Sequence, residues 1–149
     1  ESGRLSKSLI DNKKIKSIDD FPSEAIGFIY KITNEDNGKV YYGRKTCRGF
    51  TKKKLTKKEK LLPENKRKTY KTVFKEYKGW LNYTGSSEYL NNDISKGDSI
   101  KKEILRFCNK KAQLTYYELE AIICNGALLD DMSYNGNVLG KLFRNQIED

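Results

Sequence analysis

The chain lacks histidine altogether, and it has only three cysteines in 149 residues. Cys47, Cys108 and Cys124 show no Cys-x-x-Cys spacing, and without histidine they cannot complete a zinc site. Three thiols also cannot pair completely, so we interpret them as reduced packing residues of a cytoplasmic protein. The absence of histidine removes the usual base at neutral pH, so proton transfer would need another side chain.

Long apolar runs are missing as well. No stretch of eighteen apolar residues occurs, the mean hydropathy is −0.82, and no signal peptide is recognisable. We therefore expect neither a membrane protein nor a secreted one. A length of 149 residues suits one domain with its own core, without metal or disulfide staples.

Acidic residues are scarce in one part of the chain. The formal net charge is +10, but residues 44–78 alone hold fifteen basic and three acidic side chains, which leaves the remainder near −2. Local basicity of this kind predicts a polyanionic partner, although some lysine-rich segments are only solvated loops. We expect a mobile lysine-rich insertion at about 45–68. The candidate binding side chains are Lys45, Lys52, Lys53, Lys54, Lys57, Lys58, Lys66, Arg67 and Lys68.

Residues 27–43 predict a β-hairpin. Apolar and polar residues alternate on both arms, β-branched and aromatic residues dominate, and Asn37-Gly38 stands where a tight turn needs positive φ. Tyr30 and Tyr41 are therefore expected on facing strands, eleven positions apart. Either tyrosine taken alone would be interpreted as a half-buried strand residue.

The rest of the chain alternates between helix and strand signals. Residues 1–25 are polar with scattered apolar positions and predict a short helix or an arm over the domain. The other predicted elements are a helix over 69–78, a serine-capped helix over 88–95, a strand over 100–107, a helix over 114–124 and a loop over 134–137. This order predicts an α/β fold with a small three-stranded antiparallel sheet flanked by helices.

Helical spacing also predicts which apolar side chains are buried. The core candidates in and after the helix over 69–78 are Tyr70, Phe74, Tyr77 and Trp80. The predicted buried stripe of the helix over 114–124 consists of Tyr116, Leu119, Ile122 and Ile123.

The hairpin resembles the opening motif of the GIY-YIG nucleases, metal-dependent enzymes that cut DNA phosphodiesters. Tyr30 falls on the first tyrosine of that motif, and residues 41–43, Tyr-Tyr-Gly, fall on its second part. One departure is that the first glycine stands one residue early, at Gly27. The resemblance covers roughly 26–137 and implies a nuclease domain over 26–149. A second run that resembles a phage-associated branch of the family consists of Trp80, Tyr83, Gly85, Ser86 and Ser87.

The resemblance implies a pair of catalytic tyrosines and one or more phosphate-binding arginines. We assign Tyr30 as the proton acceptor and Tyr41 as a hydroxyl that positions the phosphate. The residues alone do not decide which tyrosine has which role. A tyrosine base needs its pKa, ~10 in water, lowered by cations or by a metal-bound water. Arg44 directly follows the second motif and offers a planar fork to two phosphoryl oxygens. For the family's further arginine, Arg48 is the nearest arginine and Lys52 the nearest lysine.

The metal ligand that the resemblance implies is one carboxylate on the late helix, for one Mg²⁺ or Mn²⁺ ion per active site. Glu118 and Glu120 both qualify, and because they diverge by roughly 200° around a helix, they cannot both face one ion. Ile122, at the family's apolar position four residues later, favours Glu118. Asn135 resembles the asparagine that closes many family sites and is a candidate phosphate contact.

We therefore expect a magnesium-dependent DNA endonuclease that hydrolyses phosphodiester bonds. Its expected setting is the cytoplasm or nucleoid of a host, in a phage or mobile-element role such as homing, defence or interference. The alternative is a non-catalytic, basic nucleic-acid-binding module on the same scaffold. Structured RNA as the partner has no supporting motif. A single active site fits nicking, or cleavage of both strands through a dimer or sequential attack.

Overall fold

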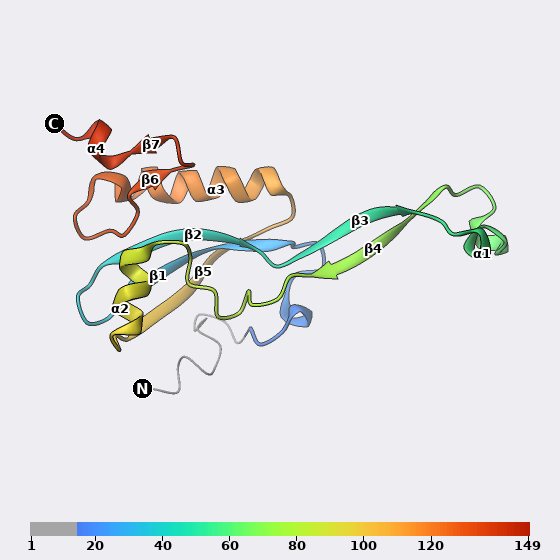
Figure 1. Cartoon of the computed structure of the whole chain (residues 1–149), viewed down its shortest axis with the longest axis horizontal. Helices are drawn as coiled ribbons and strands as arrows, with labels where there is room; N and C mark the ends of the chain where they lie inside the picture. Colours follow the sequence, from blue (N-terminus) through green and yellow to red (C-terminus); the bar gives the residue numbers. More distant parts are fainter. Residues whose placement is uncertain (1–14) are drawn as a thin grey trace.

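Three antiparallel strands form the main sheet of the computed structural model, which describes residues 15–149 (Figure 1). The sheet has the order β2-β1-β5 and is made of β1 (Gly27–Asn34), β2 (Val40–Thr46) and β5 (Ile100–Cys108). Its two covering helices are α2 (Glu88–Ser95) and α3 (Lys111–Cys124). The predicted α/β class with a small antiparallel sheet is confirmed, as are the predicted strand over 100–107 and the helices over 88–95 and 114–124.

The β1–β2 hairpin aligns the two motif tyrosines. In its register Tyr30 lies opposite Gly43 and Ile32 lies opposite Tyr41, so both tyrosines project from the same face of the sheet. The connection is longer than a two-residue loop, and of the predicted Asn-Gly pair only Gly38 takes a positive φ, 79°. The predicted hairpin is confirmed, but the predicted tight turn at Asn37-Gly38 is wrong.

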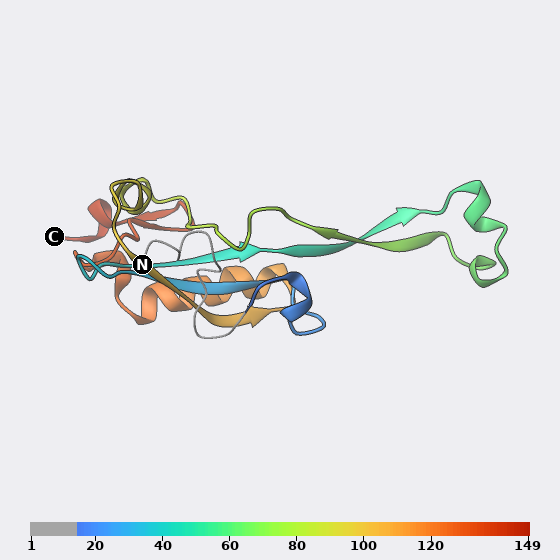
Figure 2. The ribbon, with the colours of Figure 1, turned by 90° about the horizontal axis from the view of Figure 1, so that it is seen from below.

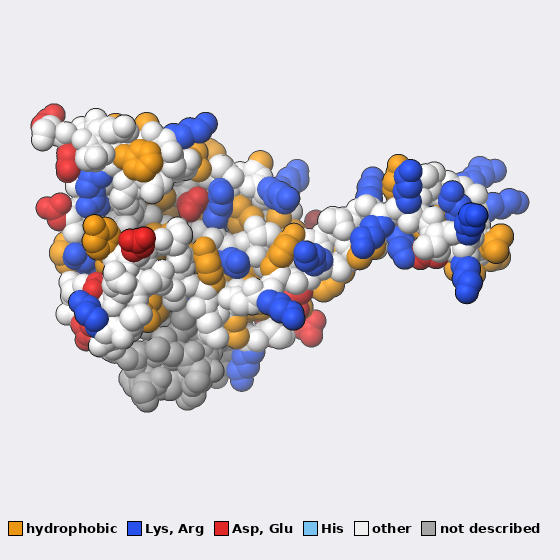
Figure 3. Space-filling view, viewed as in Figure 1, with side chains coloured by type: hydrophobic (Ala, Val, Ile, Leu, Met, Phe, Trp, Pro, Cys, Tyr) orange, Lys and Arg blue, Asp and Glu red, His pale blue; other side chains and the backbone are white. Residues whose placement is uncertain are grey.

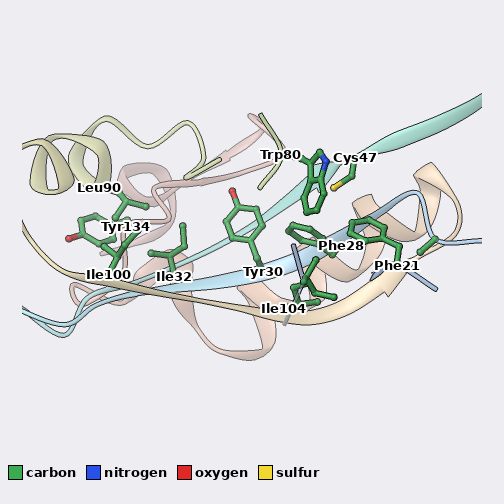
Figure 4. Close-up of a cluster of buried hydrophobic side chains, with 12 residues drawn as sticks. Phe21, Phe28, Tyr30, Ile32, Cys47, Trp80, Leu90, Ile100, Ile104 and Tyr134 are labelled. Atoms are coloured by element: carbon green, nitrogen blue, oxygen red, sulfur yellow. The ribbon is translucent and has the colours of Figure 1, made fainter. Parts of the chain in front are cut away.

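Each face of the sheet has its own core. One face carries a cluster that includes Tyr30, Trp80 and Leu90 of α2 (Figure 4). The opposite face packs Ile29 against Leu114 of α3. Because β1 is the central strand and both of its faces are covered, it is buried along most of its length, and only Lys31 and Thr33 are partly exposed.

The predicted apolar stripe of α3 is wrong in two of its four members. Ile122 is buried and Leu119 packs beside it, but Tyr116 is 57% exposed and Ile123 is 49% exposed. Leu114 takes a buried place instead, at 2% exposure. The face of α3 that meets the sheet is thus rotated from the one that the apolar spacing indicates.

A two-stranded ribbon projects from one end of the sheet (Figures 1 and 2). It consists of β3 (Arg48–Lys54) and β4 (Tyr70–Glu76), joined by the short helices α1 (Lys57–Lys60) and η3 (Pro63–Asn65). The predicted helix over 69–78 is therefore wrong, because its β-branched and aromatic residues pair across to β3. The projection covers 48–76, and so extends beyond the expected insertion at 45–68.

Contacts at the root of the ribbon hold it to the body. The indole N–H of Trp80 donates to the Glu76 carboxylate at 2.9 Å, and Trp80 itself is buried as predicted. Tyr70 and Phe74, expected in the core, are 49% and 47% exposed on the ribbon. Among the described residues the thiols are free, with Cys47 and Cys108 buried and Cys124 exposed.

The two ends of the described chain pack onto the sheet in different ways. Of the arm expected over 1–25, residues 1–14 lie outside the described residues, whereas Ile15, Phe21 and Ala25 join the core. The arm also includes a single turn of 3₁₀-helix, η2 (Ile18–Asp20). The C-terminal part consists of η4 (Ala127–Leu129), β6 (Asn137–Val138), β7 (Leu142–Phe143) and α4 (Arg144–Ile147). Within residues 15–149, no helix combines the length and the apolar character needed to cross a membrane.

Candidate active site

A cleft of about 480 Å³ runs along the β2 edge of the sheet. α3 forms one wall, the loop before α2 forms another, and the segment 134–139 closes the far side. Its chemically active lining residues are Tyr41, Arg44, Ser86, Glu118, Tyr134 and Asn135. Side chains far apart in the sequence thus meet at the edge strand of the hairpin.

Glu118 and Arg44 face each other across this cleft. One guanidinium nitrogen of Arg44, Nη1, lies 3.5 Å from Glu118 Oε1 and donates a 2.8 Å hydrogen bond to the hydroxyl of Thr115. The Glu118 side chain is only 19% exposed, and burial raises the pKa of its carboxyl group while the Arg44 cation opposes that rise. The carboxylate is therefore partly desolvated, and a single cation at 3.5 Å compensates it only in part.

Glu120 points elsewhere. It lines a separate pocket on the other side of α3, together with Arg106, Tyr117 and Cys124. The divergence expected from the helical spacing places Glu118, and not Glu120, beside Arg44 and the tyrosines. Glu88 is a second carboxylate at the cleft, exposed at its rim.

The two motif tyrosines differ in their access to solvent. Their ring centroids are 6.2 Å apart, but Tyr41 lines the cleft, whereas Tyr30 is only 1% exposed. Burial raises the pKa of both phenols, and for Tyr41 hydrogen bonds from the hydroxyl and backbone N–H of Ser86 oppose that rise. Tyr41 is thus the phenol that a bound substrate can reach.

Two glycines make room for these phenols. A Cβ atom at Gly43 would lie 2.5 Å from the hydroxyl oxygen of Tyr30, directly across the strand pair. A Cβ atom at Gly85 would lie 2.5 Å from the ring of Tyr41, and Gly85 also has a φ of +89°. Only glycine fits these close approaches without displacing a tyrosine.

The comparison with protein families agrees with this geometry. The model described as "Putative endonuclease segE, GIY-YIG domain" matches residues 9–139, which is most of the chain. The chain belongs to this GIY-YIG family. No curated protein and no solved structure gives a significant match. Membership supports nuclease activity, a hydrolytic chemistry on nucleic acid, and enzymes of this class generally depend on a metal ion.

The GIY-YIG domain also holds a buried lysine that sequence reasoning did not find. Lys102 of β5 is 0% exposed, and its ammonium group donates a 2.7 Å hydrogen bond to the carbonyl of Tyr83. The ammonium lies 4.8 Å from the centre of the Tyr30 ring, and burial lowers its pKa to about 8. Because Lys102 occurs in a run of charged residues, nothing in the sequence separated it from solvated lysines.

Arg48 lies apart from the other predicted catalytic residues. Its guanidinium donates to the backbone carbonyls of Ala25 at 2.6 Å, Pro22 at 2.7 Å and Ser23 at 3.1 Å. It is not among the residues that line the cleft. These contacts give Arg48 a structural role, since they tie the root of the ribbon to the segment before β1.

Asn135 lines the cleft, but its amide is engaged with the backbone of Tyr42. Its side-chain oxygen accepts from the Tyr42 N–H at 2.9 Å, and its Nδ2 donates to the Tyr42 carbonyl at 2.8 Å. This pair of bonds extends β2 in the way that a neighbouring strand would. Asn135 thus fixes the edge of the cleft, and the phosphate contact predicted for it has no separate support.

The predicted basic contacts lie mostly away from the cleft, on the ribbon (Figure 3). Lys45 is the exception, because it belongs to β2 and its ammonium group lies 4.3 Å from the centre of the Tyr83 ring. The exposed basic side chains of the ribbon and its tip are those of Lys52, Lys53, Lys54, Lys57, Lys58, Lys66, Arg67 and Lys68.

Within residues 15–149, no group of three or more histidine, cysteine or acidic side chains could hold a metal ion. The cleft nevertheless suits a hard cation that needs few protein ligands, because Glu118 offers a partly desolvated carboxylate. Mg²⁺ commonly binds through one or two carboxylates, keeps several waters and takes phosphate oxygens of the substrate as further ligands.

Proposed function

We propose that this GIY-YIG domain is a magnesium-dependent DNA endonuclease. The observation that carries the proposal is the convergence of Tyr41, Arg44 and Glu118 on one cleft from two elements, β2 and α3. A phenol, a guanidinium and a carboxylate supply a proton-transfer group, a phosphate-binding cation and a metal ligand.

Glu118 is the residue that we propose to hold the metal ion, with Mg²⁺ as the expected ion and Mn²⁺ as a substitute. The bound ion would supply positive charge to the phosphoryl and leaving oxygens and lower the pKa of a coordinated water. The single ion pair of Glu118 with Arg44 is long, at 3.5 Å, so the carboxylate can still take a cation.

The side chains of the cleft divide the remaining work. Arg44 is 41% exposed and can present its fork to two oxygens of the scissile phosphate. Tyr41 lines the cleft, and the two hydrogen bonds from Ser86 oppose part of the rise that burial causes in its pKa. We assign it as the acceptor of the proton from a water whose own pKa a bound ion would lower. Tyr30 lies beneath the cleft and holds the Tyr41 ring in place. The role of proton acceptor, assigned to Tyr30 from the sequence, thus passes to Tyr41, and Tyr30 becomes a positioning residue.

The charge of the chain supports DNA as the substrate. The +12 on residues 44–78 lies next to the cleft in the sequence, since Arg44 is its first residue. Such a segment binds phosphates through Lys and Arg side chains and releases counterions. We further propose a role in a phage or mobile genetic element, in homing, defence or interference.

Supercoiled plasmid tests this proposal most directly. In Mg²⁺ or Mn²⁺ the protein should convert the plasmid to nicked or linear forms, and EDTA should stop the reaction. Glu118→Ala should lose cleavage by at least about 10³-fold while a gel-shift assay still detects DNA binding.

Glu120→Ala is the matched control, because it removes the same group two residues away and should cut normally. Full activity in Glu118→Ala together with loss in Glu120→Ala would place the metal on the other side of α3. Binding without cleavage in every divalent metal would instead favour the non-catalytic module.

A further inference from the structure

The β3–β4 ribbon stands free of the body, with little of its surface covered (Figures 2 and 3). An isolated two-stranded ribbon is at best marginally stable in water, because it has no layer to pack against. Residues 48–76 nevertheless contain twelve basic and three acidic side chains, with Phe50 and Phe74 nearly half exposed. The charge and the open faces together indicate that the ribbon packs against an anionic partner.

The two faces of the ribbon carry different side chains. Directly opposed residues share a face, so one face, here called the Lys52 face, carries Phe50 with Phe74, Lys52 with Thr72, and Lys54 with Tyr70. The other face, here called the Lys53 face, carries Gly49 with Lys75, Thr51 with Val73, and Lys53 with Lys71.

Along the outer part of the two strands, the ion pair that the described residues form lies on the Lys53 face. Glu59 of α1 pairs with Lys71 there. On the Lys52 face the one acid is Glu76, at the root, where it is bonded to Trp80. Between Phe50 and Lys54, the strand residues of the Lys52 face thus present donors and aromatic rings and include no carboxylate.

We propose that the ribbon lies in the major groove of duplex DNA with the Lys52 face turned toward the base edges. This inference rests on the proposed DNA substrate. The major groove, about 12 Å wide, admits a two-stranded ribbon, whereas the minor groove at about 6 Å does not. Strands in a pair lie about 4.8 Å apart. Lysine and threonine side chains can then reach guanine acceptors and thymine methyl groups.

The ribbon has a fixed reach from the cleft. β2 leads into β3 through the single residue Cys47, and the two strands follow one line in Figure 2. The ten residues from Arg44 to Lys54 span about 33 Å at about 3.3 Å per residue. One turn of B-DNA is about 34 Å, so the ribbon occupies the groove about one helical turn to one side of the scissile phosphate.

Duplexes with one groove filled test the groove without requiring cleavage. A duplex of about four turns is used unmodified, with biotin on the C5 atoms of its thymines, or saturated with the minor-groove ligand netropsin. The full chain should bind the C5-modified duplex at least about tenfold more weakly than the plain one, and netropsin should change little. Equal binding to plain and C5-modified DNA, or stronger interference from netropsin, would overturn the inference.

Two charge-matched variants test the face. Lys52→Ala/Lys54→Ala should bind plain duplex more weakly and lose its sensitivity to the C5 groups. Lys53→Ala/Lys75→Ala removes the same charge from the opposite face and should keep that sensitivity. If the second pair loses the sensitivity and the first keeps it, the assigned face is wrong.

A cleavage assay tests where the ribbon lies along the DNA relative to the scissile phosphate. On a duplex with a mapped cut, C5 groups placed about one turn to one side should block cutting, and groups on the other side should not. Symmetrical blocking would contradict the reach set by β2 and β3. Groove-dependent binding without any cleavage would refute the proposed nuclease while leaving the ribbon's groove assigned.

Discussion

In the cleft, a few partly buried groups are held at fixed distances, whereas on the ribbon many charges stand in solvent with few neighbours. Glu118 is 19% exposed and lies 3.5 Å from Arg44, but the lysines of β3 are exposed to solvent. Both regions are built on one continuous path of chain, because β2 passes into β3 after Cys47. The comparison indicates that position matters at the cleft, whereas on the ribbon total charge and the choice of face matter.

A methyl group added to each region should have very different effects. Gly43→Ala should lower the cleavage rate by about 10²-fold, because the new Cβ would lie 2.5 Å from the Tyr30 hydroxyl and displace the tyrosine pair. Single-turnover cleavage measures this rate, and DNA affinity should be unchanged.

Gly49→Ala on β3 is the control for Gly43→Ala. A Cβ there meets only the Tyr77 ring at 3.6 Å or more, an ordinary contact, so cleavage should persist. Equal losses in the two variants would show that the tyrosines tolerate displacement and that the close fit at Gly43 does not matter for the reaction.

The buried lysine, Lys102, should make the free energy of unfolding depend on pH. The folded-state pKa of Lys102 is about 8, below the ordinary 10.5, so between these values the unfolded chain binds more protons. Stability from this group should therefore rise with pH above about 8, by roughly 1 kcal/mol between pH 8 and 9. Denaturant unfolding of the wild type and of Lys102→Met measures the difference.

Cys47 also makes stability depend on pH. Burial raises the pKa of its thiol to about 12, so this group lowers stability as the pH rises above 9. Lys102 and Cys47 are coupled, because the ammonium charge lowers the pKa of the thiol, so the two proteins are compared only from pH 7 to 9, below most of the Cys47 effect. If the wild type and Lys102→Met change in parallel from pH 7 to 9, Lys102 is not desolvated in solution.

Sequence patterns predicted the elements that local chemistry specifies. The β1–β2 hairpin follows from its alternation and from Gly38, and α2 follows from the Ser87 hydroxyl, which accepts a hydrogen bond from the Leu90 N–H. The ribbon was missed because both of its faces are exposed and charged, so its strands lack the half-buried alternation by which strands are recognised.

The candidate site was predicted in part for a similar reason. Tyr41, Arg44 and Glu118 were found by motif and spacing and do meet in one cleft. The environments of Arg48 and Lys102 depend on backbone carbonyls supplied by distant segments, at 22–25 and at Tyr83. No local pattern encodes which carbonyl a long cationic side chain will find, so their structural use could not be read from the sequence.

The smallest expected effect belongs to one ribbon charge. Lys53→Ala should reduce the slope of log affinity against log salt by about 0.9 on duplex DNA, because one phosphate contact and its released counterion are lost. Titrations at several salt concentrations, with cleavage blocked by EDTA, give the slope. Cleavage at saturating DNA should stay close to wild type, since Lys53 lies outside the cleft.

Lys96→Ala is the control for this charge effect. Lys96 is exposed on the body, and its ammonium group already lies 3.1 Å from the carboxylate of Asp93. It therefore has a partner within the protein and is not expected to contact a phosphate or to release a counterion from DNA. Its removal should leave the slope unchanged. If Lys96→Ala lowers the slope as much as Lys53→Ala does, DNA binding depends on the net charge of the whole chain. The ribbon would then have no special part in binding, and the contrast with the cleft would be lost.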